Sequence, residues 1–232
     1  MLSFGVVQHI RRLSGEKKVG HTGTLDPQAT GLLILCLGRA TKLVESIMAG
    51  EKEYEGEMVI GVRTDSLDGD GTVTHSMETS VVEEDVRVLL PRFTGTIMQI
   101  PPMVSAARHQ GQRLYDLARA GHVVERAPKK ITVHSFELTQ WTPGPQPRAR
   151  FRVLCSKGTY VRSLVSDIGD LLGVGAYLSA LRRTRSGTFS VQEARPLLEL
   201  DHMAKQNELS HVILPMTDAI RRIKNGAPVI SP

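Results

Sequence analysis

The sequence predicts an α+β protein, in which strands and helices follow one another at irregular spacing and do not repeat as βαβ units. Glutamates alternate with apolar residues over Glu53–Val62, which predicts a half-buried strand. Apolar residues at helical spacing between Val161 and Leu172 predict an amphipathic helix. The chain has 232 residues, 41% of them hydrophobic and 23% charged, so it can bury a substantial core.

Two helices are expected before the first long strand. Phe4–Leu13 places its apolar residues on one stripe, and Ser3 is the expected N-cap. Thr41–Ala49 is expected to be helical and to end at Gly50, because glycine commonly follows the last turn of a helix.

The middle of the chain begins with the strand at Glu53–Val62. Tyr54 lies on its apolar side, and three glutamates occupy the other side. Ser80 and Glu83 have the spacing of a capping box ahead of apolar residues at helical spacing. A short helix is therefore expected to start there.

The second half of the chain combines strands and helices. Gln112–Ala120 is expected to form a short basic helix, whereas Ile131–Leu138 and Ala149–Ser156 are expected to be strands. After the helix that ends near Leu172, the segments Ala176–Leu181 and Leu197–Lys205 are expected to form further helices.

The chain is basic, with a formal net charge of +5 and a pI of about 9.4, which favours a polyanionic partner. Arg148, Arg150 and Arg152 alternate with apolar residues, so one strand would expose a row of guanidinium groups. Two further basic clusters comprise Arg108, His109, Arg113, Arg119, Arg126, Lys129 and Lys130, and then Arg182, Arg183 and Arg185. Three separated clusters are typical of a protein that follows a phosphate backbone.

The expected compartment is the cytoplasm. No apolar run approaches the ~20 residues that a membrane helix needs, and the N-terminus lacks the order of a secretory signal. Cys36 and Cys155 each lie within an apolar, strand-like run, so both are expected to be buried thiols of a reducing compartment.

Several common cofactor sites have no sequence counterpart. The chain contains no phosphate-binding GxxxxGK[ST] loop and no Cys/His spacing typical of zinc. Asp65–Gly71 superficially resembles a calcium loop but lacks its acidic positions, and is interpreted as an acidic turn.

Two elements stand out as candidate chemistry. The stretch GHTGTLDP at Gly20–Pro27 places one carboxylate, Asp26, in a loop of small and hydroxyl residues. It fits either an Asx-type turn before a buried strand or a loop held rigidly for catalysis. Arg162 lies at the start of the helix after CSKGTY, and on local grounds alone it could pair with Asp167 or with solvent.

Six motifs occur in one order with matching spacing. They are GHTGTLDP with the following ATGLL and GRATK, E-K-E-Y at Glu51–Tyr54, R-T-D and D-G-D-G within Arg63–Gly71, L-Y-D-L-A-R-A-G at Leu114–Gly121, C-S-K-G-T-Y-V-R from Cys155, and L-R-R at Leu181–Arg183. Through them the chain resembles the TruB-type tRNA pseudouridine(55) synthases over about residues 3 to 216. The resemblance implies the pseudouridine synthase fold, a mixed and mostly antiparallel sheet flanked by helices.

The resemblance also implies residue roles. Asp26 would be the carboxylate that attacks the target uridine, at ring C6 or at ribose C1′, and Arg162 would pair with it. Tyr54 would stack on the target base and is a candidate for proton transfer at C5, although a core tyrosine would give the same strand pattern. The substrate-binding positions implied are His21, Tyr160 and Leu181. The reaction needs no cofactor and no metal.

The resemblance further implies the domain organisation and the partner. A catalytic domain would span residues 1–215 with an RNA-gripping insertion at 99–130, and 216–232 would be a stub where a further small RNA-binding domain would start. The family's opening K-P-x-G-x-T-S motif has no counterpart before the first helix.

The expected partner is the T-stem-loop of tRNA, whose uridine 55 is flipped out of the loop for isomerisation. A monomer without an obligatory protein partner is expected. Two alternatives remain at this point: a non-catalytic tRNA-binding or tRNA-folding protein on the same fold, and a guide-RNA-dependent synthase acting on ribosomal RNA.

Overall fold

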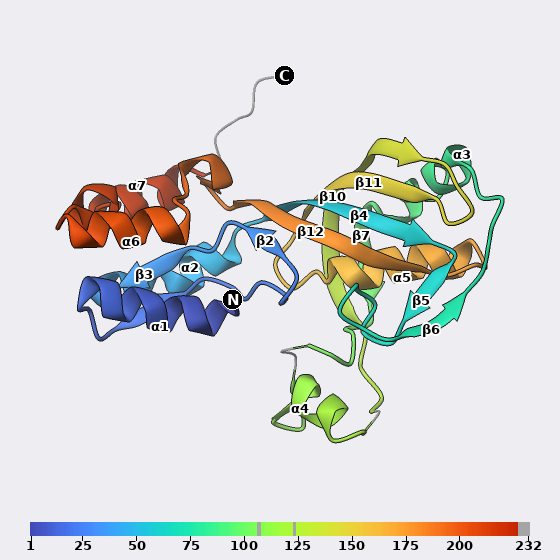
Figure 1. Cartoon of the computed structure of the whole chain (residues 1–232), viewed down its shortest axis with the longest axis horizontal. Helices are drawn as coiled ribbons and strands as arrows, with labels where there is room; N and C mark the ends of the chain where they lie inside the picture. The colour runs from blue at the N-terminus through green and yellow to red at the C-terminus, as the bar shows by residue number, and fades with distance from the viewer. Residues whose placement is uncertain (106–107, 123, 227–232) are drawn as a thin grey trace. The chain divides into compact units, whose positions relative to one another are not determined.

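The computed structural model describes residues 1–105, 108–122 and 124–226 (Figure 1). The chain divides into two compact units, of which the first combines Met1–Glu53 with Arg182–Pro232 and the second is Tyr54–Leu181. Both boundaries fall inside strands, namely β4 (Lys52–Ile60) and β12 (Ala176–Ser186).

The second unit contains most of the sheet. Besides its parts of β4 and β12, its elements are β5 (Val62–Thr64), β6 (Val73–Ser76), α3 (Glu83–Arg87), the 3-10 turn η2 (Leu90–Phe93), β7 (Gly95–Gln99), β8 (Arg108–His109), β9 (Gln112–Arg113), α4 (Leu114–Arg119), β10 (Lys129–Thr142), β11 (Arg148–Cys155) and α5 (Val161–Leu171).

Within the described residues, a seven-stranded sheet has the order β13-β12-β4-β11-β10-β7, with β2 beside β12. β10 is antiparallel to β11 and to β7, with Phe136 opposite Val153 and Lys129 opposite Gln99. β2 (Thr30–Gly31) is parallel to β12. The predicted α+β class with a mixed, mostly antiparallel sheet is confirmed.

The core of the second unit forms between this sheet and α5. Leu164, Val165 and Ile168 of α5 are fully buried, as the predicted apolar stripe requires. A Cβ at Gly169 would lie 2.1 Å from the main-chain nitrogen of Ala176, so only glycine lets α5 approach the start of β12 this closely.

The first unit combines short paired strands with several helices. Besides its parts of β4 and β12, its elements are α1 (Ser3–Ser14), β1 (Val19–His21), β2, β3 (Leu35–Leu37), the 3-10 turn η1 (Gly38–Leu43), α2 (Val44–Ala49), β13 (Phe189–Ser190), η3 (Val191–Glu193), α6 (Leu197–Lys205), η4 (Leu209–Val212) and α7 (Met216–Asn225). β1 and β3 pair antiparallel, which places Gly20 opposite Cys36.

The core of the first unit lies between α1, α6 and the β1–β3 pair. Val7 and Ile10 of α1 pack with Val19, and leucines of α6 complete the cluster. A hydrogen bond of 2.8 Å between His9 Nε2 and Asp201 Oδ1 joins α1 to α6. Among the described helices, none is long and apolar enough to cross a membrane.

Most of the predicted elements are present within a few residues of their expected ends. The helices predicted at Phe4–Leu13, Thr41–Ala49 and Leu197–Lys205 are confirmed. Cys36 and Cys155 are both buried, also as predicted.

The helix predicted at Ala176–Leu181 is wrong, because this segment is the first half of strand β12. Its alanines and leucines have good helix propensity, but propensity is a weak guide where tertiary packing decides. Ala176 and Leu178 face the core on alternate positions, as a strand requires.

Two predicted caps are also wrong. Leu2 is the N-cap of α1, and the Ser3 hydroxyl bonds instead to the main chain of Leu25. α3 begins at Glu83 after Val82, whose amide donates to the Asp85 carboxylate at 2.9 Å, so Ser80 does not start the helix.

Candidate active site

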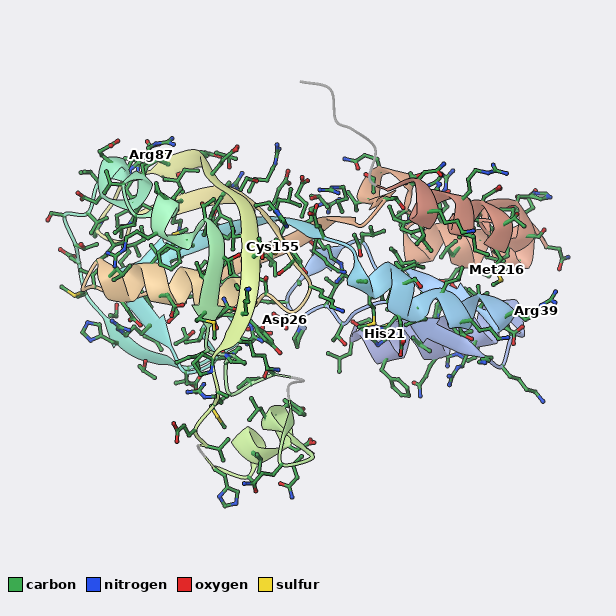
Figure 2. All side chains as sticks on the ribbon, turned by 180° about the vertical axis from the view of Figure 1, so that it is seen from behind. His21, Asp26, Arg39, Arg87, Cys155 and Met216 are labelled. Atoms are coloured by element: carbon green, nitrogen blue, oxygen red, sulfur yellow. The ribbon has the colours of Figure 1, made fainter. Side chains whose placement is uncertain are left out.

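The loop that carries Asp26 runs from the end of β1 to the start of β2 in the first unit. Its first residue is fixed by the hairpin, because the Thr22 amide donates to the carbonyl of Ile34 at 3.1 Å. The Asp26 carbonyl accepts from the Ala29 amide at 2.9 Å, which closes a tight turn. Figure 2 shows Asp26 and His21 on this N-terminal segment. The Asp26 side chain is half-buried.

The first turn of α1 holds this loop from one side. The Ser3 side chain is buried, and its hydroxyl accepts a hydrogen bond from the Leu25 amide at 3.0 Å. The same hydroxyl lies 3.5 Å from the Leu25 carbonyl oxygen. The residue before Asp26 is therefore tied to a helix that is itself packed in the core of the first unit.

Arg183 of β12 holds the loop from the other side. Only 3% of its surface is exposed, and its Nε donates to the Leu32 carbonyl at 2.8 Å while its Nη2 donates to the Gly23 carbonyl at 3.1 Å. Gly31 lies opposite Arg183 at a φ of 96°, and a Cβ there would be 2.3 Å from the Arg183 carbonyl oxygen. Arg183 thus fixes both ends of the segment that contains Asp26.

This role corrects the prediction that Arg183 belongs to a cluster facing phosphates. Its guanidinium is buried against main-chain carbonyls, and Arg185 is also largely buried and donates to the Gly187 carbonyl. Of that predicted cluster, Arg182 has an exposed side chain. The sequence signal was present in the L-R-R motif, but it does not tell which arginine faces inward.

His21 closes the start of the loop. Its Nδ1 accepts a hydrogen bond from the Gly23 amide at 3.3 Å, which leaves the proton of the neutral ring on Nε2. Burial lowers the pKa of His21, and the positive charge of Arg183 lowers that pKa further. His21 is therefore a neutral hydrogen-bonding group near pH 7.

Arg162 lies in the first turn of α5 in the second unit, with only 3% of its surface exposed. Its Nη1 lies 3.2 Å from the Asp68 carboxylate and donates to the Ser66 carbonyl at 2.9 Å. Its Nη2 donates to the Val104 carbonyl at 2.9 Å. The alternative in which Arg162 points to solvent is thus wrong, since the arginine is buried, and Asp68 is one of its ion-pair partners.

Asp68 was not predicted as a site residue, because Asp65–Gly71 is interpreted from the sequence only as an acidic turn. It is 3% exposed, and its carboxylate accepts hydrogen bonds from the Ser66 hydroxyl and, at 3.2 Å, from the Asp70 amide. The turn also pairs with β12, because the Leu178 amide donates to Leu67 and the Gly69 amide donates to Leu178. These bonds hold the turn in place, so that the buried Asp68 carboxylate lies against Arg162 of α5.

The other predicted site residues of the second unit lie on two strands and a helix start. Tyr54 is half-buried on β4, and Leu181 is 7% exposed on β12. Tyr160 is the N-cap residue of α5, two positions before Arg162. These residues share one compact unit, whereas Asp26 and His21 belong to the other, so the pairing of Asp26 with Arg162 stays a prediction.

The remaining basic clusters are only partly described. Arg148 and Arg150 are exposed on β11, as predicted, but both pair with Glu57 of β4, at 2.8 Å and 3.4 Å. Arg152 pairs with Glu55 at 3.5 Å. The structure does not describe residues 106–107 and 123 of the predicted insertion, nor the side chains of its basic residues Arg108, His109, Arg113 and Arg119. Residues 227–232 of the predicted stub also lie outside the described residues.

Comparison with protein families identifies the chain. Residues 11–161 match the TruB family pseudouridylate synthase N-terminal domain, and residues 162–221 match the tRNA pseudouridylate synthase B C-terminal domain. The chain belongs to the TruB family of pseudouridylate synthases. The predicted family and its enzyme class, an isomerase, are thereby confirmed.

Bacterial relatives support the same assignment. The chain is 50% identical over 201 residues to the tRNA pseudouridine synthase B of Symbiobacterium thermophilum, covering 86% of this chain and 67% of the relative. It is 42% identical over 243 residues to the enzyme of the same name from Moorella thermoacetica, covering 99% of this chain and 80% of that one.

Solved structures agree in fold. A chain in a crystal structure of a Cbf5–Nop10–Gar1 complex matches with a TM-score of 0.73 and 30% sequence identity, and the match covers 96% of this chain. This chain spans 59% of the length of that solved chain. A structure of an H/ACA RNP bound to a substrate RNA matches with a TM-score of 0.69 and 27% identity.

Proposed function

We propose that this TruB family protein isomerises uridine 55 in the T-loop of tRNA to pseudouridine, with Asp26 as the nucleophile. The observation that carries the proposal is the Asp26 loop, which lies in the GHTGTLDP motif and is fixed by Ser3 and Arg183 from buried positions. A carboxylate on a loop held this firmly suits a reaction in which one side chain must meet one atom of the substrate.

The reaction is a rearrangement within one nucleotide. The bond from N1 of uracil to C1′ of ribose breaks, the base turns, and a bond from C5 to C1′ forms. The C5 proton is lost and N1 gains a proton, so atoms and electrons balance without an oxidant. The Asp26 carboxylate forms an ester-like adduct at C6 or at C1′ and is released at the end, which keeps the intermediate on the enzyme.

Each further residue has a part in this scheme. Tyr54 stacks on the flipped uracil and is the candidate for moving the C5 proton, while Tyr160 and Leu181 line the pocket. His21 contacts the displaced RNA as a neutral donor, consistent with its lowered pKa. Extruding the base costs a few kcal/mol, which stacking and hydrogen bonds of the pocket offset.

Arg162 is the cation of the site in this proposal. A guanidinium has five N–H donors, so its bonds to Ser66, Asp68 and Val104 are compatible with a further carboxylate. The buried Asp68 holds the guanidinium in one orientation. A guanidinium close to Asp26 would favour the ionised, nucleophilic form of that carboxylate.

The proposed organisation is a catalytic domain over residues 1–215 that carries the RNA-gripping insertion at 99–130. The protein acts in the cytoplasm as a monomer on tRNA. The guide-RNA-dependent alternative is weaker, because identity is 42–50% to tRNA pseudouridine synthases B but 30% to Cbf5.

The test uses purified protein and a tRNA transcript without any other component. We expect pseudouridine at position 55 alone, mapped by chemical modification and primer extension. A transcript with cytidine at position 55 is the control and should remain unmodified. A bare T-stem-loop should also be a substrate. A requirement for a guide RNA or a second protein, or modification at another uridine, would contradict the proposal.

A further inference from the structure

Gln99 is the last residue of β7 and one of the most buried polar groups of the second unit, with 2% of its surface exposed. Its side-chain amide forms two hydrogen bonds with the main chain of Tyr160. Gln99 Oε1 accepts from the Tyr160 amide at 2.8 Å, and Gln99 Nε2 donates to the Tyr160 carbonyl at 3.0 Å. A primary amide that pairs with both the main-chain amide and the carbonyl of one residue fixes the position and orientation of that residue's backbone.

Tyr160 is the N-cap residue of α5, and its own side chain makes no capping hydrogen bond. The first amides of a helix lack partners inside the helix, so they need bonds from elsewhere. The Tyr160 carbonyl already accepts the first bond of the helix, from the Leu164 amide at 3.2 Å. Gln99 therefore sets the start of α5, two residues before Arg162.

The chain that leaves β7 is tied to the same end of α5 at two further points. The Ser163 hydroxyl donates to the Ile100 carbonyl at 3.1 Å, and Arg162 Nη2 donates to the Val104 carbonyl at 2.9 Å. Residues 99 to 104 thus bond to three of the first residues of α5. The same segment is the start of the predicted RNA-gripping insertion.

We propose that Gln99 is a positioning residue of the synthase, which holds Tyr160 and Arg162 at fixed positions relative to the first residues of the insertion. The inference rests on the proposed function. Gln99 itself touches neither the substrate nor Asp26 in this account.

The test replaces Gln99 in the full chain by Met, which has nearly the same shape but cannot bond to Tyr160. We expect kcat for pseudouridine formation on tRNA to fall about tenfold to a hundredfold, because small displacements of catalytic groups are costly, while KM and tRNA affinity stay close to wild type. Gln99→Glu, which keeps the acceptor but sets a carboxylate oxygen against the Tyr160 carbonyl, should lose at least as much activity.

Two further variants separate positioning from general loss of structure. Gln146→Met removes an exposed amide of the same unit, which bonds to the Ser76 hydroxyl, and should leave kcat unchanged. Ser163→Ala removes the neighbouring bond to Ile100 with a minimal change of volume, and should lower kcat in the same direction if Gln99→Met proves too unstable to assay.

The outcomes are distinct. An unchanged kcat in Gln99→Met, an unchanged kcat in both Gln99→Glu and Ser163→Ala, or a loss that appears only as a higher KM would overturn the inference. A fall in kcat that simply follows a fall in thermal midpoint, shared by Gln146→Met, would overturn it as well. Failure of the proposed function is recognised separately, because the wild-type protein would then form no pseudouridine at position 55.

Discussion

Two neighbouring arginines of β12 show how one position decides a residue's role. Side chains of a strand alternate between its faces, so Arg182 is exposed while Arg183 is buried with its guanidinium on the carbonyls of Gly23 and Leu32. Both were predicted to belong to one basic cluster that follows a phosphate backbone, because they are adjacent in the sequence. A strand register would have placed Arg183 on the inner face with Leu181.

Replacing Arg183 by Met should destabilise the protein by about 3 kcal/mol, since two buried carbonyl groups lose their partner. The Asp26 loop would lose its anchor at Gly23, so activity should fall more than stability alone explains. Urea unfolding and pseudouridine formation measure the two effects. Arg182→Met is the matched control, and its unfolding free energy should lie within about 0.5 kcal/mol of wild type. Equal effects of the two variants would refute the assigned roles.

His21 predicts a pH dependence of stability. Because its pKa in the folded protein is lowered from 6.5, the ring is neutral in both states well above that pH and contributes no difference. As the pH falls below about 6.5, the unfolded chain binds the proton more readily, so this group makes the folded protein less stable.

His21→Gln should remove that part of the acid sensitivity. The difference in unfolding free energy between about pH 7.5 and about pH 5.5 should be smaller in the variant than in wild type, as measured by urea titration. His202→Gln, at an exposed position of α6, is the control and should behave as wild type. The interpretation fails if His21→Gln is as acid-sensitive as the parent.

At the scale of elements, the acidic turn Asp65–Gly71 and helix α5 form one unit through the buried pair of Asp68 and Arg162. Both motifs and their order were predicted, but Asp65–Gly71 was interpreted only as an acidic turn, with no partner for its aspartates. Local composition gives no more than this, because aspartate and glycine favour turns. The pairing is a long-range contact, and no local pattern reports it.

Asp68→Asn tests this pair. The amide keeps the shape of the side chain but leaves the Arg162 charge without its buried partner, which should cost about 3 kcal/mol of unfolding free energy. Asp70→Asn changes an exposed aspartate of the same turn and should cost less than about 0.5 kcal/mol. Chemical denaturation of the two variants side by side gives the answer, and a harmless Asp68→Asn would mean that the pair contributes no net stability.

The segment Ala176–Leu181 was predicted to be a helix but forms the first half of strand β12. A short apolar run of alanine and leucine fits a buried helix or a buried strand equally well by periodicity. Its place in the sheet, with Leu178 bonded to the turn at Leu67 and Gly69, is set by partners distant in sequence. The long amphipathic helix α5 and the alternating strand β4 had no such ambiguity, and both were predicted correctly.

For the whole molecule, the sequence predicted the fold class and the family, because six motifs in register constrain both. The predicted site residues divide between two compact units, with Asp26 and His21 in one and Tyr54, Tyr160, Arg162 and Leu181 in the other. Sequence motifs identify such residues, but the supports of the site, Ser3, Arg183, Asp68 and Gln99, are found only from hydrogen bonds in the structure.

The net charge of +5 gives a further prediction for the whole molecule. Not every arginine is available to RNA, because Arg148 pairs with Glu57 and Arg183 is buried. Arg182→Gln should weaken tRNA binding and reduce the slope of log K against log salt by about 1, whereas Arg148→Gln should leave the slope near wild type. Filter binding at several salt concentrations measures both slopes, and identical slopes for the two variants would disprove the distinction.

The central claim is that the Asp26 carboxylate carries out the isomerisation, and tritium release from tRNA labelled at C5 of uridine tests it most directly. Asp26→Asn should release no tritium above background while it binds the same tRNA with an affinity close to wild type, since an amide fills the same space but is not a nucleophile. Tritium release by Asp26→Asn at a rate near wild type would contradict the account.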